Sequence, residues 1–164
     1  MDKFQDQLAF PEWNESQIRI GLTGGIASGK SNVGEFLKTS LNLPILDTDV
    51  YSHEALSKDS TSTEIIIKRY GIKILKQGIQ ENNIIDRKKL AQIIFEDSKE
   101  RFWLEALLHP IIIKRLLEEI KYYKESPIIV MIIPLLFEAN LTYICNQIWV
   151  VNCSLRQQQD RLMK

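Results

Sequence analysis

The sequence predicts an α/β fold in which a parallel sheet is sandwiched by helices, and three features predict it. Short apolar runs, two of them rich in β-branched residues, indicate buried strands at residues 18–22, 43–47, 128–133 and 148–151. The stretches between the runs leave room for crossover helices, and right-handed crossovers build a parallel sheet. A glycine-rich segment directly follows the first run, as when a strand ends in a tight turn. From residue 18 on, the chain is therefore expected to begin with a strand, a loop and a helix.

Helices are expected in the intervening segments. One follows Lys30, where apolar residues recur at three- and four-residue spacing. Asp86 has the position of an N-cap before a second helix, and Ser98 begins a third. Pro110 suits the first turn of a further helix, because its missing N–H has no helical partner there.

These elements divide the chain into four segments. Residues 1–17 form a polar N-terminal extension, and residues 18–55, which contain the glycine-rich segment, form the first part of the α/β core. Residues 56–109 show helical rather than strand signals and form a helical insertion. Residues 110–164 form the second part of the core and the start of another helix, at Ser154.

The composition is that of one soluble globular domain. The chain has 164 residues, of which 45% are hydrophobic and 26% charged, with a formal net charge of zero. No global basic field is available to hold nucleic acid or an anionic membrane, so any bound anion must be held locally. The sequence has no apolar run of the roughly 20 residues that span a bilayer and no signal-peptide layout, which predicts a cytoplasmic protein. Cys145 and Cys153 lack metal-like spacing and are expected to be buried, reduced thiols.

The glycine-rich segment matches the pattern G-x-x-x-x-G-K-[ST] in its proper context, after a strand and before a helix. Its backbone N–H groups and the helix N-terminus are expected to surround phosphate oxygens. Lys30 is expected to reach the β- and γ-phosphates of ATP, and Ser31 to offer its hydroxyl to Mg²⁺. The alternative is an ordinary glycine-rich turn. The pattern predicts a P-loop NTPase-type sheet with these cofactor-binding residues: Gly24, Gly25, Ile26, Ala27, Ser28, Gly29, Lys30, Ser31 and Asn32.

An acidic pair, Asp47 and Asp49, lies at the C-terminal end of the second predicted strand. We expect this strand to be adjacent to the strand before the P-loop, which places the pair in the crevice where open α/β sheets bind ligands. Asp49 is the favoured general base for an acceptor hydroxyl, and Asp47 can orient a metal-bound water. The alternative for Asp47 is that it caps the helix that starts near Val50.

Several separated segments resemble the dephospho-CoA kinase family. They are the P-loop at 20–33, the acidic strand end at 46–49, Leu-Leu-His-Pro-Ile at 107–111, Pro-Leu-Leu-Phe-Glu at 134–138 and the insertion helix at 87–95. The resemblance implies ATP-dependent phosphorylation of the ribose 3′-hydroxyl of dephospho-CoA, giving coenzyme A and ADP. We also expect a cytoplasmic enzyme that is a monomer or weak homo-oligomer, with no nucleic-acid or membrane partner.

The resemblance also implies roles for residues outside the P-loop. Arg87, His109 and Glu138 become candidates for an acceptor site that the helical insertion forms facing the P-loop, and Arg161 falls where the family's lid helix supplies an arginine. Each acceptor candidate has a structural alternative: a solvated face for Arg87, a helix cap for His109 and a turn cap for Glu138. The chain departs from the family at Ala27 and Asn32, where glycine and threonine are usual. It also stops at Lys164, where the family continues with further lid residues.

Other functions fit the sequence less well. Another small-molecule P-loop kinase, acting on a nucleoside, nucleotide or metabolite, shares the loop and the acidic strand end but not the His-Pro and Pro-Leu-Leu-Phe-Glu segments. A GTPase switch needs Asp-x-x-Gly and Asn-Lys-x-Asp motifs, which the sequence does not contain. A paralogue that keeps the fold without catalysis is the third alternative.

Overall fold

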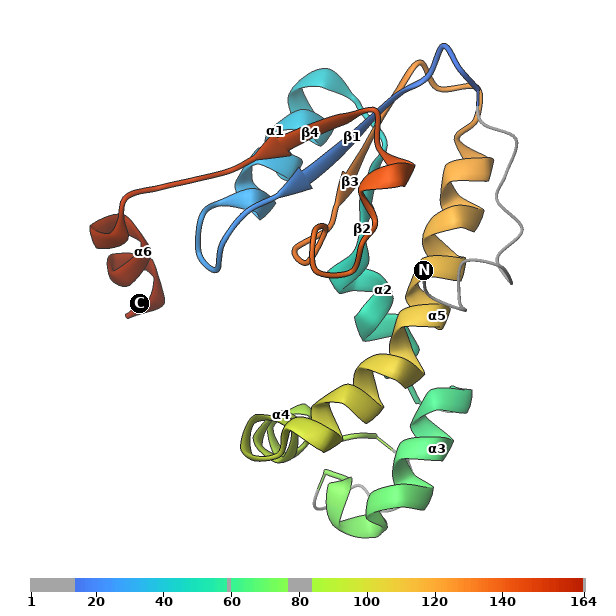
Figure 1. The fold of residues 1–164 in the computed structure, drawn as a ribbon, viewed down its shortest axis with the longest axis vertical. Coiled ribbons are helices and arrows are strands. Elements are labelled where there is room, and N and C mark those ends of the chain that lie inside the picture. Colours follow the sequence, from blue (N-terminus) through green and yellow to red (C-terminus); the bar gives the residue numbers. More distant parts are fainter. Residues whose placement is uncertain (1–13, 59, 77–83, 164) are drawn as a thin grey trace. The chain divides into compact units, whose positions relative to one another are not determined.

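The computed structural model describes residues 14–58, 60–76 and 84–163 (Figure 1). The chain divides into two compact units. The sheet unit comprises the described residues of Ala9–Asp49 and Leu116–Lys164, and the helical unit comprises those of Val50–Arg115. Of the polar extension expected at 1–17, residues 1–13 lie outside the described residues.

The sheet unit contains a parallel sheet of strands β1 (Ile18–Thr23), β2 (Ile45–Asp47), β3 (Ile128–Ile132) and β4 (Gln147–Val150). All four runs predicted as strands form strands, with ends that differ by up to two residues. The expectation of buried strands was wrong for β4, because all four of its residues are exposed. The strand order is β2-β3-β1-β4 (Figure 1). The expectation that β2 is adjacent to β1 was wrong, because β3 lies between them. The α/β fold class is confirmed.

The core of the sheet unit forms where helix α1 (Lys30–Leu41) packs on the sheet. Leu37 of this helix joins a buried apolar cluster with Ile20, Leu22, Val130 and Ile132. Burying each such side chain contributes roughly 1.5–3 kcal/mol, which is why β-branched and leucine side chains are found here. The helix ends where Asn42 takes a left-handed conformation, at φ 50°, and its N–H donates to the carbonyl of Leu37.

The helical unit has its own core. Its elements are α2 (Thr48–Ala55, of which residues from Val50 on belong here), α3 (Thr61–Tyr70), the short 3₁₀-helix η2 (Ile72–Ile74), α4 (Arg87–Glu96) and the first part of α5 (Ser98–Tyr122). Asp86 caps α4 as predicted, since its carboxylate accepts hydrogen bonds from the N–H groups of Lys88 and Lys89. The buried apolar residues shared by these elements are Ala55, Ile66, Ile74, Leu75, Ile85, Leu90, Leu104 and Leu108.

One helix prediction was wrong. Pro110 does not begin a helix but lies inside α5, which runs without a break from Ser98 to Tyr122. Proline removes one helical hydrogen bond and its ring opposes the carbonyl four residues earlier. Leu104 and Leu108 before it, and Leu116 after it, are buried, and this burial offsets the local cost of the proline.

The C-terminal part of the described chain leads from the sheet to helix α6 (Leu155–Leu162). Ser154 begins this helix as predicted: its hydroxyl accepts from the N–H of Gln157, and the Gln157 side chain accepts from the N–H of Ser154. Cys145 and Cys153, on either side of β4, are free thiols, but both are half-buried rather than buried. Burial raises the pKa of the Cys145 thiol to about 11.

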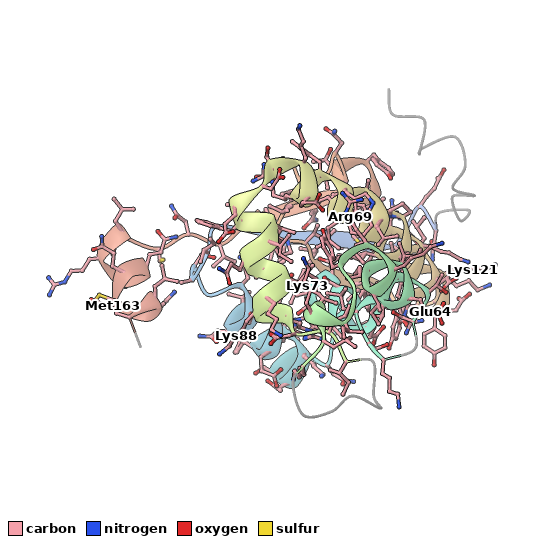
Figure 2. All side chains as sticks on the ribbon, turned by 90° about the horizontal axis from the view of Figure 1, so that it is seen from below. Glu64, Arg69, Lys73, Lys88, Lys121 and Met163 are labelled. Carbon is pink, nitrogen blue, oxygen red and sulfur yellow. The ribbon has the colours of Figure 1, made fainter. Side chains whose placement is uncertain are left out.

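Arg69 of α3, labelled in Figure 2, joins a polar and aromatic cluster with three side chains of the helical unit. Its guanidinium donates to both carboxylate oxygens of Glu100, at 2.7 Å each. The Tyr70 hydroxyl donates to the same carboxylate at 2.5 Å, and the Arg69 guanidinium lies 4.3 Å from the centre of the Trp103 ring. These contacts connect α3 to α5.

The Glu100 carboxylate makes the helical unit sensitive to acid. Hydrogen bonds from Arg69, and then from Tyr70, lower its pKa from 4.5 to about 2. The ionised carboxylate stabilises the folded helical unit fully above pH 4.5. This stabilisation is lost as the pH falls toward 2, because the unfolded chain takes up the proton first.

We expect Glu100→Gln to flatten the decline in the stability of the chain between pH 4.5 and 2, measured by circular dichroism from pH 6 to 2. The control is Glu96→Gln, at the exposed end of α4. A Glu100→Gln profile parallel to that of the parent chain would contradict this prediction.

Candidate phosphate-binding site

The glycine-rich loop connects the end of β1 at Thr23 to the start of α1 at Lys30. Gly24 and Gly29 have φ angles of 147° and 107°, a region that favours glycine. A Cβ atom at Gly24 would lie 2.2 Å from the carbonyl oxygen of Val151, which belongs to the backbone after β4. The sequence therefore needs glycine at position 24 both for its conformation and for the close approach of two chain segments.

We expect Gly24→Ala to destabilise the sheet unit by roughly 2–4 kcal/mol, because alanine is strained at this φ angle and its methyl group meets a backbone atom. Gly25→Ala is the matched control. A Cβ atom there would meet only the Gln158 side chain, at an ordinary 3.5 Å. Thermal unfolding of the two variants measures the difference. Equal melting temperatures would show that the backbone at Gly24 relaxes without cost.

Ala27 is the third loop residue in a left-handed conformation, with φ 55°. A residue with a side chain pays about 1–2 kcal/mol there, whereas glycine does not. The resemblance described in the sequence analysis implies glycine at this position, and alanine there has a local conformational cost.

The Lys30 side chain reaches back over the loop. Its ammonium group donates to the carbonyls of Gly24, at 2.7 Å, and Gly25, at 2.9 Å. Two side chains of α6 contact the rest of the loop: Gln158 donates to the carbonyl of Ile26 at 2.6 Å, and Arg161 donates to those of Ala27 and Ser28 at 2.9 and 2.8 Å.

Ser28 indicates what the loop binds. Its side-chain oxygen is buried and has no hydrogen-bond partner among the described residues. A buried hydroxyl without a partner costs about 1–3 kcal/mol, and a phosphate oxygen is a suitable acceptor for it. Together with the Lys30 cation and the N-terminus of α1, this hydroxyl fits the phosphate group of a nucleotide. Ser31 is exposed in the first turn of α1, and Asn32 follows it, also exposed.

The acidic pair lies at the same edge of the sheet as the loop. Asp47 ends β2 and pairs with Ile132 of β3, which in turn pairs with Leu22 of β1. Two inter-strand spacings separate β2 from β1, about 10 Å in all. The Asp47 carboxylate accepts a hydrogen bond from the N–H of Asp49 at 2.9 Å. Asp47 thus has the geometry of a cap for α2, and Asp49 is in the first turn of that helix.

The other predicted site residues are divided between the two units. Glu138 is exposed in the turn that follows β3, and Arg161 is on α6, both in the sheet unit. Arg87 and His109 belong to the helical unit. Arg87 is exposed at the start of α4 and donates to the carbonyl of His53 at 3.2 Å. His109 is half-buried within α5, so the alternative that it caps a helix was wrong.

Sequence reasoning missed Gln158. The signal was its spacing of three residues from Arg161, which puts both side chains on one face of a helix that starts at Ser154.

Among the residues that the structure describes, no group of three or more His, Cys, Asp or Glu side chains is placed to hold a metal ion. None of the helices in the described ranges is both long and apolar enough to cross a membrane. The parallel sheet, the glycine loop and its lysine define a P-loop nucleotide-binding protein.

The chain belongs to the dephospho-CoA kinase family, since a family model described as Dephospho-CoA kinase matches residues 18–164. A dephospho-CoA kinase of Prochlorococcus marinus is 51% identical over 156 residues, which are 95% of this chain and 74% of the relative. The chain is thus a member of a kinase family that uses ATP.

Two solved structures are similar to this chain. The crystal structure of TT1252 from Thermus thermophilus has a TM-score of 0.72 and 33% identity, over 90% of this chain and 71% of that one. A dephospho-CoA kinase from Campylobacter jejuni has a TM-score of 0.60 over 88% of this chain and 93% of that one, and at 21% identity it supports the fold alone.

Proposed function

We propose that this chain transfers the γ-phosphoryl group of ATP to the ribose 3′-hydroxyl of dephospho-CoA, giving coenzyme A and ADP. The observation that carries the proposal is a glycine-rich loop, with its lysine and a buried hydroxyl that has no partner among the described residues, in a chain that belongs to the dephospho-CoA kinase family. The proposal includes a cytoplasmic enzyme that is a monomer or weak homo-oligomer.

The loop binds the phosphates of ATP. The Lys30 ammonium exchanges the carbonyls of Gly24 and Gly25 for β- and γ-phosphate oxygens, and the Ser28 hydroxyl gains an acceptor. Ser31 is the residue of the loop that would hold Mg²⁺, through its side-chain hydroxyl. When bound, Mg²⁺ would neutralise negative charge on the β- and γ-phosphates.

Asp49 acts as the general base. Its carboxylate takes the proton of the ribose 3′-hydroxyl as that oxygen forms a bond to the γ-phosphorus, while the bond from the γ-phosphorus to the β–γ bridging oxygen breaks and ADP leaves. Its position in the first turn of α2, at the carboxyl edge of the sheet, supports this role. Asp47 fixes the start of α2 through its hydrogen bond to the N–H of Asp49 and can orient a metal-bound water. Arg87, His109 and Glu138 remain proposed contacts for the acceptor.

The acceptor is tested by ADP formation from Mg·ATP with dephospho-CoA, with adenosine, and without acceptor. The proposal predicts ADP formation that depends on dephospho-CoA and is far slower with adenosine. Faster turnover with a nucleoside or nucleotide would instead favour another small-molecule P-loop kinase. Binding of ATP without any acceptor-dependent turnover would contradict the catalytic proposal and leave nucleotide binding intact.

A further inference from the structure

Side chains hold every carbonyl oxygen of the loop from Gly24 to Ser28. Lys30 holds the first two, Gln158 the third, and Arg161 the last two, at distances between 2.6 and 2.9 Å. The Cys153 thiol lies 3.8 Å from the carbonyl of Ala27, at the limit of a sulfur hydrogen bond. The three carbonyls held by Gln158 and Arg161 are consecutive, and both donors come from α6.

The orientation of these carbonyls sets the orientation of the N–H groups that bind phosphate. In a planar trans peptide, the carbonyl of one residue and the N–H of the next point in opposite directions. Holding the carbonyls of Ile26, Ala27 and Ser28 therefore directs the N–H groups of residues 27, 28 and 29 away from α6. In this structure the N–H of Ser28 donates to the carbonyl of Gly25 at 3.2 Å, within the loop.

The position of α6 does not depend on apolar packing, because none of its residues is buried. Leu155, Leu162 and Met163, which is labelled in Figure 2, are exposed. Hydrogen bonds from Gln158 and Arg161 to the loop are thus the specific contacts of this helix with the site. Arg161 also lies against Gly29, where a Cβ atom would be 3.2 Å from its guanidinium nitrogen.

We propose that Gln158 and Arg161 are positioning residues that hold the phosphate-binding loop by its carbonyls, so that the N–H groups of Ala27 and Gly29 are preorganised for a nucleotide phosphate. The inference rests on the proposed function only in taking a nucleotide as the ligand of the loop. It gives Arg161 a task at the loop itself, because the guanidinium nitrogen that faces the loop is engaged by two carbonyls. Gln158 is a further determinant of nucleotide affinity.

Gln158 is tested by Gln158→Met, which keeps the side-chain length and removes the donor. We expect about tenfold weaker binding of Mg·ATP by calorimetry, the effect of one lost hydrogen bond together with a less ordered loop. The matched control is Gln159→Met, because Gln159 is its exposed neighbour on the same helix. Gln158→Glu, which replaces the donor by a carboxylate facing a carbonyl, is expected to bind more weakly still.

Arg161 is tested by Arg161→Met, with Arg156→Met as control, since Arg156 is an exposed arginine of the same helix. The loss of two charge-assisted hydrogen bonds is expected to weaken Mg·ATP binding about thirtyfold. Without nucleotide, amide hydrogen exchange of residues 27–29 is expected to be faster in both test variants, whereas exchange within α1 and the melting temperature stay as in the parent chain.

Two outcomes would overturn the inference. In the first, Gln158→Met and Arg161→Met bind Mg·ATP as tightly as their control variants and show the same amide hydrogen exchange at residues 27–29. The other is a loss of affinity that appears only together with a lower melting temperature, which would indicate a general structural role. Because affinity and exchange are measured without acceptor, a failure to phosphorylate dephospho-CoA would refute the proposed function and leave this test valid.

Discussion

Replacing Lys30 with alanine is expected to lower kcat by a factor of about 10²–10³ or more. The removal of a group that stabilises charge in a transition state has an effect of this size. The only contacts of its ammonium group that the structure describes are the carbonyls of Gly24 and Gly25, and the side chain is partly exposed. Folding should therefore tolerate the change. Initial rates of ADP formation and a circular dichroism melt measure both effects.

Lys38→Ala provides the control for Lys30→Ala. Lys38 is an exposed lysine in the last turn of the same helix, so this variant removes one positive charge from α1 away from the loop. We expect its kcat to match that of the parent chain. A Lys30→Ala chain that is folded and turns over at the rate of Lys38→Ala would contradict the assignment of the loop as the site of phosphoryl transfer.

Asp49→Asn is expected to lower kcat by about 10²–10⁴, the usual contribution of a general base, and to leave the affinity for Mg·ATP nearly unchanged. Asparagine has the same size but cannot accept the proton. The hydrogen bond that the Asp49 N–H donates to Asp47 does not involve the replaced group, so the start of α2 is retained. Steady-state kinetics and calorimetry separate the two quantities.

Asp47→Asn separates the roles of the two acidic residues. The amide oxygen of asparagine also accepts hydrogen bonds and caps helices, so this variant should keep the start of α2 and lose less kcat than Asp49→Asn. Glu35→Gln, at an exposed position of α1, is the control for charge. A larger loss of kcat in Asp47→Asn than in Asp49→Asn would exchange the roles assigned to the two residues.

The strands and the loop could be predicted because their signals are local. Apolar runs such as 128–132 must be buried on both faces, and the glycines before Lys30 permit backbone angles that other residues rarely adopt. The order of the strands could not be read in this way. β2 follows β1 in the sequence, yet β3 lies between them, because pairing depends on the packing of the whole sheet unit and not on chain order.

Two details of the helices show where local signals fail. Pro110 was expected to begin a helix, but the buried leucines on both sides of it keep α5 continuous, and this compensation comes from tertiary packing. Gln158 is one of three consecutive glutamines on a helix without buried residues, so no hydrophobic pattern distinguishes it. Its spacing from Arg161 places it on the same helix face, and its hydrogen bond to the carbonyl of Ile26 identifies it as part of the site.

The central claim is tested most directly by identifying the phosphorylated product. The chain is incubated with Mg·ATP labelled at the γ-phosphate and with dephospho-CoA, and the product is examined by mass spectrometry and ³¹P NMR. The account predicts that the label is found on the ribose 3′-oxygen, in coenzyme A, in an amount equal to the ADP formed. Label recovered only as free phosphate, or on another position of the acceptor, would contradict it.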